Sequence, residues 1–161
     1  MSTEQVGLAA RTRGDAMTSK ADFTEQEWEL VRAGPPTAGM ITLLASSGGT
    51  FRETWALAKT FAEARQQHGE SELLDALVAE KPEMKRYHSR EEAENDGLSL
   101  LRQAVALLDQ KASSEEVESY KRFTLNVAER VAEAHQEEGT SVSSEEQDTI
   151  AKIASSLEPS P

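Results

Sequence analysis

The chain has 161 residues, 37% of them hydrophobic and 29% charged, a composition typical of one folded helical domain and not of a disordered chain. Its formal net charge of -12 argues against sequence-independent binding to nucleic acid or to anionic lipid surfaces, which requires clustered Lys and Arg. The absence of cysteine excludes disulfides, thiolate catalysis and Cys-ligated zinc.

Residues 1–22 are small and polar and have no sustained period, which predicts a flexible N-terminal extension. They contain no apolar stretch of the kind found in a signal peptide. No apolar run elsewhere reaches the roughly 18 residues of a membrane-spanning helix. We therefore expect a cytoplasmic protein without a membrane partner.

The first strong helix signal is a capping box formed by Thr24 and Glu27. Phe23 and Trp28 flank this box in the positions of a hydrophobic staple, so a helix is expected to begin here. The Gly-Pro-Pro run at 34–36 predicts that this first helix is short, because proline lacks the backbone N–H that a helix interior needs.

A second, almost wholly apolar helix is expected over residues 37–46. After a Ser-Gly-Gly turn, Thr50 and Glu53 form another capping box, which opens a helix running to about Gln67. This helix carries six apolar residues to pack inward: Phe51, Trp55, Leu57, Ala58, Phe61 and Ala62. The simplest interpretation of both tryptophans is that they are core side chains; the alternative is that one of them lines a groove.

Four more helix signals follow along the chain. A short amphipathic helix is expected at residues 73–78, and three longer helices follow, ending near Lys111, His135 and Leu157. Each longer helix has one expected inward stripe: Leu98, Leu101, Ala104, Val105 and Leu108 in the first, Val117, Tyr120, Thr124, Val127, Ala128, Val131 and His135 in the second, and Ile150, Ile153, Ala154 and Leu157 in the third. Their capping boxes are Ser89/Glu92, Ser113/Glu116 and Ser143/Glu146.

No segment keeps the two-residue alternation of a strand for more than a few residues. The predicted fold is therefore all-α, with one domain of about seven helices over residues 23–157 and a frayed tail at 158–161.

Two parts of this domain follow a similar plan. Residues 38–64 and 128–157 each read as a helix, a Ser- or Gly-containing turn, a capping box and a second helix. One interpretation is a duplicated helical hairpin. The alternative is that any two helical hairpins look alike at this level of detail.

A resemblance rests on four stretches: FTEQEW, AGPPTAGMITLLASSGG, LLRQAVALLDQKASSEEVESYKRFTLNVAERVAEA and VSSEEQDTIAKIASSL. This pattern resembles a family of uncharacterised bacterial all-helical proteins that is itself similar to the TerB-like domains of tellurite-resistance systems. The resemblance covers about residues 23–157 and implies an all-helical fold with two pseudo-repeated hairpins.

The resemblance also implies a function at the two interhelical turns, which in TerB-like domains carry acidic residues able to bind a divalent metal. Here the turns at 46–50 and 139–143 contain no carboxylate. Only the glutamates that follow them remain, at Glu53, Glu145 and Glu146. Because hard cations require several oxygen ligands, the sequence predicts no metal site and no cofactor.

The turn before residue 53 is a candidate anion site. Gly48 and Gly49 allow close approach to backbone N–H groups at a helix start, beside Thr50 and Arg52. The ordinary interpretation is a turn with a capping threonine, since the full phosphate-binding loop motif is absent.

Two further features are candidate contact sites. Lys85 and Arg86 belong to a basic cluster at 81–90 that would suit an acidic partner, although such a connector more often pairs with neighbouring glutamates. His135 near a helix end would serve as a metal ligand or, more simply, as a side chain favoured at the negative end of a helix. A carboxylate row at Glu129, Glu133 and Glu137 is typical of a solvated helix face.

No catalytic motif occurs in the sequence. The function predicted from the sequence is a cytoplasmic helical interaction or scaffold domain that binds a protein partner without catalysis, as a monomer or homodimer. The alternative is a metal- or small-ligand-binding stress-response module of the TerB-like kind.

Overall fold

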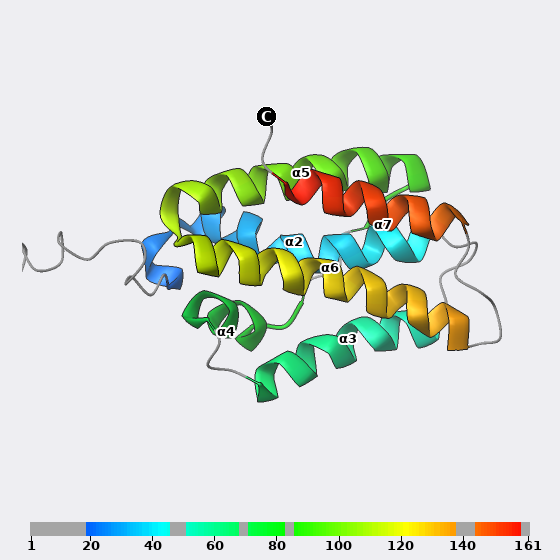
Figure 1. Cartoon of the computed structure of the whole chain (residues 1–161), viewed down its shortest axis with the longest axis horizontal. Helices are drawn as coiled ribbons and strands as arrows, with labels where there is room; N and C mark the ends of the chain where they lie inside the picture. The colour runs from blue at the N-terminus through cyan, green and yellow to red at the C-terminus, as the bar shows by residue number, and fades with distance from the viewer. Residues whose placement is uncertain (1–18, 46–50, 68–70, 83–85, 138–143, 159–161) are drawn as a thin grey trace, which may run out of the picture.

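The computed structural model describes residues 19–45, 51–67, 71–82, 86–137 and 144–158, with the side chains at 51–54 and 135–137 left undescribed. Across these residues the chain is all-α and has no strand, as predicted. A 3₁₀ turn, η1 (Lys20–Asp22), leads into six α-helices (Figure 1). They are α2 (Glu25–Ala45), α3 (Phe51–Gln66), α4 (Glu72–Ala79), α5 (Arg90–Lys111), α6 (Ser114–Glu137) and α7 (Ser144–Leu157). None of these described helices has both the length and the apolar character that a bilayer span requires.

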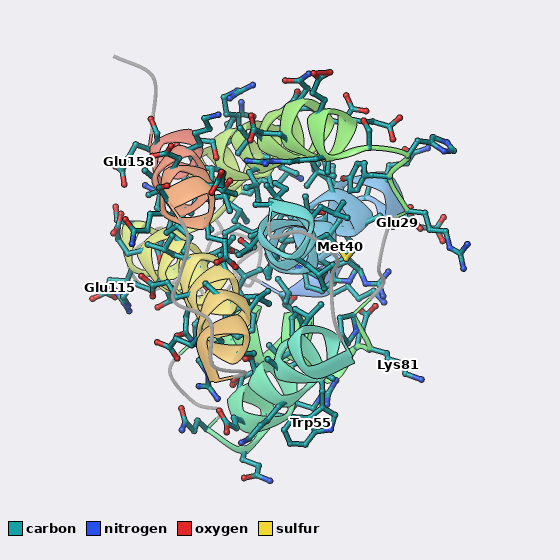
Figure 2. All side chains as sticks on the ribbon, turned by 90° about the vertical axis from the view of Figure 1, so that its right-hand side faces the viewer. Glu29, Met40, Trp55, Lys81, Glu115 and Glu158 are labelled. Carbon is teal, nitrogen blue, oxygen red and sulfur yellow. The ribbon has the colours of Figure 1, made fainter. Side chains whose placement is uncertain are left out.

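Helix α2 lies in the middle of the bundle. Viewed from one end, α5 lies on one side of it, α6 and α7 on a second side and α3 on a third (Figure 2). The most extensive contacts of α2 are with α5 and α6, whereas α3 packs mainly on α6 and α4. Helices α3 and α4 therefore form one edge of the molecule (Figure 1).

The Gly-Pro-Pro run at 34–36 does not end a helix. The prediction of a short helix followed by a second one was wrong, because Pro35 and Pro36 lie inside the 21-residue helix α2. The bundle accordingly has six described α-helices instead of the expected seven. A proline inside a helix costs about 3 kcal/mol or more. Burial offsets this cost, since every residue from 34 to 39 is buried among the neighbouring helices.

Tyr120 of α6 makes the hydrogen bond that Pro35 is unable to make. In a regular helix the N–H of residue 35 would donate to the Val31 carbonyl, and proline has no N–H. The Tyr120 hydroxyl donates to this carbonyl instead, at 2.7 Å. Tyr120 is fully buried, and burial raises the pKa of its hydroxyl, so the group stays a neutral donor.

Gly34 provides the space for this hydroxyl. A Cβ atom at position 34 would overlap the Tyr120 hydroxyl oxygen. The missing Cβ also removes part of the steric conflict between residue 34 and the Pro35 ring. Gly97 of α5 allows a similarly close approach on another side of α2, where a Cβ would lie 2.6 Å from Ile41 Cδ1.

Most residues of the predicted inward stripes are buried in the structure, whereas Leu98, Ile150 and Ala154 are half-buried. In α6 the buried stripe consists of Val117, Tyr120, Thr124, Val127, Ala128 and Val131. In α5 it consists of Leu101, Ala104, Val105 and Leu108, and in α7 of Ile153 and Leu157. Burying each large aliphatic side chain of this kind contributes about 1.5–3 kcal/mol. These stripes form one continuous core with α2.

The capping boxes at Thr24/Glu27 and Ser113/Glu116 are confirmed in full. At both, the hydroxyl oxygen accepts from the glutamate N–H at 3.1 Å. The glutamate carboxylate accepts in return from the N–H of Thr24 at 2.9 Å and of Ser113 at 3.1 Å. Local sequence therefore defines these two helix starts.

The predicted capping box at Ser89 and Glu92 forms only in part. The Ser89 hydroxyl accepts from the Glu92 N–H at 3.0 Å, but the Glu92 carboxylate accepts from the N–H of His88 instead of that of Ser89. The boxes predicted at Thr50 and Ser143 lie outside the described residues.

We expect Tyr120→Phe to lower the free energy of unfolding by about 1–3 kcal/mol, because it leaves the Val31 carbonyl buried without its donor. Urea unfolding followed by circular dichroism measures this change. The slope of the unfolding curve should stay constant, since the surface exposed on unfolding is the same.

Gly34→Ala provides the matched test of the same contact. Alone, it should be strongly destabilising, because the added Cβ displaces the Tyr120 hydroxyl. In the Tyr120→Phe background it should cost less, with a coupling of about 0.5–3 kcal/mol in a double-mutant cycle. Additive effects of the two substitutions would contradict this account of the contact.

Candidate functional site

A groove of about 290 Å³ lies between α3, α4 and α6. Its lining is mostly polar and includes three apolar side chains. The lining residues are Thr60, Glu63, Ala64 and Gln67 of α3, Leu74 and Asp75 of α4, and Ser119, Arg122, Phe123, Asn126 and Arg130 of α6.

The charges in this groove balance, since it contains two arginines and two carboxylates. Arg130 forms an ion pair with Glu63 at 2.9 Å, and Arg122 donates to the Ser119 hydroxyl at 3.2 Å. The Arg130–Glu63 pair joins α6 to α3. We therefore interpret the groove as a polar seam that fixes α3 on the bundle.

The inner face of α3 is apolar and well anchored. Leu57 and Phe61 are 2% and 1% exposed, and the Phe61 ring meets the Phe123 ring of α6 edge-on at 5.2 Å between centroids. Near the end of the helix, Arg65 Nε donates to the Val78 carbonyl at the end of α4, at 2.6 Å. Helix α3 is thus held by an aromatic contact, an ion pair and a hydrogen bond.

The outer face of α3 carries a tryptophan. Trp55 is 55% exposed and is the large hydrophobic side chain that the described surface leaves exposed. Ala58 and Ala62, three and seven residues later, are also exposed and lie on the same helix face. Figure 2 shows the Trp55 ring at the outer edge of the molecule, pointing away from the bundle. The Lys59 ammonium lies over the ring, 5.2 Å from its centroid.

The prediction that Trp55 is a core residue was therefore wrong, as was the inward placement of Ala58 and Ala62. The sequence of α3 has apolar residues on two faces, and only one face meets the bundle because α3 lies at its edge (Figure 1). Leu57 and Phe61 occupy the buried face. No local signal decides between the two stripes, because both have helical spacing.

Helix α3 also differs from the other helices in charge. It contains three basic and two acidic residues, whereas each of the other described α-helices contains more acidic than basic residues. On its exposed face the described charges are Lys59 and Arg65, both basic. The described carboxylate, Glu63, is engaged with Arg130. The Trp55 surface is therefore a basic area on an acidic protein.

A second charged cluster centres on Glu80, directly after α4. Its carboxylate accepts from Trp28 Nε1 at 2.8 Å and pairs with Lys20 at 3.0 Å and Arg32 at 3.1 Å. Trp28 is 2% exposed, as predicted, and packs on the Phe23 ring at 5.7 Å between centroids. This cluster joins the N-terminal turn and α2 to α4 and serves the fold.

The structure describes few of the predicted site residues. Arg86 is exposed in the connector before α5. His135 lies in α6, but its side chain is not described, and neither is that of Arg52 in α3. The other candidates, Gly48, Gly49, Thr50 and Lys85, lie outside the described residues.

The two turns that the TerB resemblance points to, at 46–50 and 138–143, also lie outside the described residues. Where side chains are described, no group of three or more His, Asp or Glu residues is arranged to hold a metal ion. Glu129 and Glu133 of the carboxylate row are exposed.

No family model matches the chain, and comparison with curated proteins and with solved structures gives no match either. The function is therefore inferred from the structure and chemistry of the described residues.

Glu80 should make stability depend on pH. Partial burial raises the pKa of its carboxyl, but the Trp28 hydrogen bond and the charges of Lys20 and Arg32 outweigh burial and hold the pKa below the ordinary value of 4.5. A group with a lowered folded-state pKa stabilises the fold above its unfolded pKa and loses that contribution as the pH falls through its folded pKa. We therefore expect Glu80→Gln to destabilise the protein at neutral pH.

The difference in unfolding free energy between the wild type and Glu80→Gln should shrink as the pH falls from neutral through the folded-state pKa of Glu80, where the wild-type carboxylate becomes protonated. Urea titrations at a series of pH values measure it. A difference independent of pH would contradict the role of the Glu80 charge.

Proposed function

We propose that this protein is a helical interaction domain that binds a protein partner through the outer face of α3, without catalysing a reaction. The observation that carries this proposal is Trp55, which is 55% exposed on the described surface. An exposed tryptophan is a typical anchor of protein–protein interfaces, because it buries a large area at little cost in side-chain entropy.

The anchoring of α3 supports this proposal. The inner face is fixed by Leu57, Phe61 and the Arg130–Glu63 pair at 2.9 Å. A partner would therefore meet a preformed helix face and would not have to order it on binding. Ala58 and Ala62 leave room beside the tryptophan, so that a second helix lying along α3 would approach closely.

The structural roles of four glutamates support the proposal that the domain does not catalyse a reaction. Glu27 and Glu116 cap helices, and Glu63 and Glu80 hold pairs of helices together. We propose the cytoplasm as the location on the basis of the sequence composition. The metal-binding alternative and the repeated TerB-like hairpins remain predictions, because both depend on turns outside the described residues.

Trp55 and Trp28 should respond very differently to truncation. Trp55→Ala is expected to lower the free energy of unfolding by less than about 1 kcal/mol, since it removes one exposed side chain and its contact with Lys59. Trp28→Ala should cost about 3–5 kcal/mol, as a cavity in the core. Chemical unfolding of both variants gives the comparison. Equal losses would show that Trp55 is needed for folding and would remove the basis of the proposal.

Site-specific photo-crosslinking tests the binding itself. Ala58 on α3 and Ala106 on α5 are both exposed alanines, so each is replaced by p-benzoylphenylalanine in the full chain expressed in its own cells. We expect a crosslinked protein from position 58 that disappears when Trp55→Ala is added, and none from position 106. A product at 58 that persists in the Trp55→Ala variant, or the absence of any product, would argue against this face.

A further inference from the structure

We infer that the partner presents an acidic amphipathic helix, whose apolar side covers Trp55, Ala58 and Ala62 and whose carboxylates pair with Lys59 and Arg65. This inference rests on the proposed function and adds the chemistry of the partner. It depends on the charge pattern of α3 and on the spacing of its exposed residues.

Charge complementarity is the first step. Of the described α-helices, α3 is the one in which basic residues outnumber acidic residues, in a chain of net charge -12. A basic area against an acidic background attracts a negatively charged partner to this place and repels it elsewhere. The charge pattern therefore favours both the acidic character of the partner and its location on α3.

The position of the charges relative to the tryptophan is the second step. Lys59 lies one helical turn after Trp55, and its ammonium is 5.2 Å from the centre of the Trp55 ring. A carboxylate that reaches Lys59 is therefore next to the ring that the apolar side of the same helix would cover. Arg65 lies near the end of α3 on the opposite flank of the apolar residues, where its Nε donates to the Val78 carbonyl.

The shape of the face is the third step. Trp55, Ala58 and Ala62 are spaced by three and four residues and form one ridge of a helix, with a large side chain at one end and small ones beyond it. A helix packed along this ridge places a large apolar side chain over the alanines. This is the arrangement in which an amphipathic helix is recognised through positions three and four apart.

A second copy of this chain fits the face less well. A symmetric pairing of α3 with α3 would bring Lys59 and Arg65 of one copy close to the same residues of the other. Two molecules of net charge -12 also repel each other. Both effects favour a different protein as the occupant.

Three stapled peptides of about 18 residues test the inference, because short unstapled helices are only marginally stable. All three carry the same leucine face, and their flanking positions are glutamate, lysine or glutamine. Binding is followed by the indole N–H signals of the full-length ¹⁵N-labelled protein, assigned with Trp55→Phe. Trp28 serves as an internal reference, since its indole N–H is bound to Glu80 at 2.8 Å.

We expect the glutamate peptide to shift the Trp55 signal and not the Trp28 signal, and to bind about tenfold or more tightly than the lysine peptide at low salt. The preference should shrink at about 1 M salt, where the screening length falls to roughly 3 Å. Lys59→Glu should weaken the glutamate peptide about tenfold. Arg102→Glu, which changes the net charge equally at an exposed residue of α5 on the far side of α2 (Figure 2), should leave binding unchanged.

Other results would overturn the inference in distinguishable ways. If the lysine peptide binds equally well at Trp55, the acidic partner is excluded while the α3 face remains a binding surface. If no peptide shifts the Trp55 signal, a helical partner on this face is excluded, and the crosslinking at Ala58 decides the proposed function. If sedimentation shows a dimer that Trp55→Ala dissociates, the occupant is a second copy.

Discussion

The hydrogen bond from the Tyr120 hydroxyl to the Val31 carbonyl replaces the one that Pro35 is unable to make inside α2, and the packing of the bundle depends on the continuity of this helix. Without the bond, the carbonyl released by Pro35 would be a buried acceptor with its helical donor missing. Gly34 belongs to the same arrangement, because any larger residue there would occupy the place of the hydroxyl. One contact between α2 and α6 thus fixes the helix around which α5, α6 and α7 assemble (Figure 2).

The position of α3 follows from this arrangement. With α5 and α6 making the most extensive contacts with α2, α3 packs mainly on α6 and keeps one face toward solvent. Its inner face is fixed by Phe61 against Phe123 and by Arg130 against Glu63. The outer face presents Trp55 beside Lys59. Rigidity on one side and an exposed aromatic residue on the other are the two properties that a preformed binding surface requires.

The distribution of charge favours an acidic partner at this surface. The chain as a whole carries a net charge of -12 and repels negatively charged molecules over most of its surface. A local group of basic residues therefore attracts an acidic partner to one place more selectively than it would on a neutral protein. The basic residues near Glu80 are different, since Lys20 and Arg32 are engaged in a contact between elements of the fold. We propose that Lys59 is instead available for recognition, together with the guanidinium nitrogens of Arg65 other than the Nε that donates to Val78.

Sequence patterns did not predict which face of α3 is exposed or what charge that face has. The spacing of apolar residues in α3 is compatible with two buried stripes, one through Leu57 and Phe61 and one through Trp55 and Ala58. Which stripe faces the core depends on how many neighbours the helix has. That number is a property of the assembled bundle. The basic character of the exposed face emerges only once Glu63 is seen paired with Arg130.

The sequence by itself determined the all-α class, the buried stripes of α5, α6 and α7, and the helix starts at Thr24 and Ser113, because periodicity and capping act between residues close together in the chain. Only the tertiary structure decided that α2 passes through Pro35, because the donor that replaces the lost N–H comes from Tyr120, 89 residues away from Val31 in sequence. It also decided that Trp55 is exposed while Trp28 is buried. Both outcomes depend on which helices pack against each other, and local sequence patterns do not specify contacts between residues far apart in the chain.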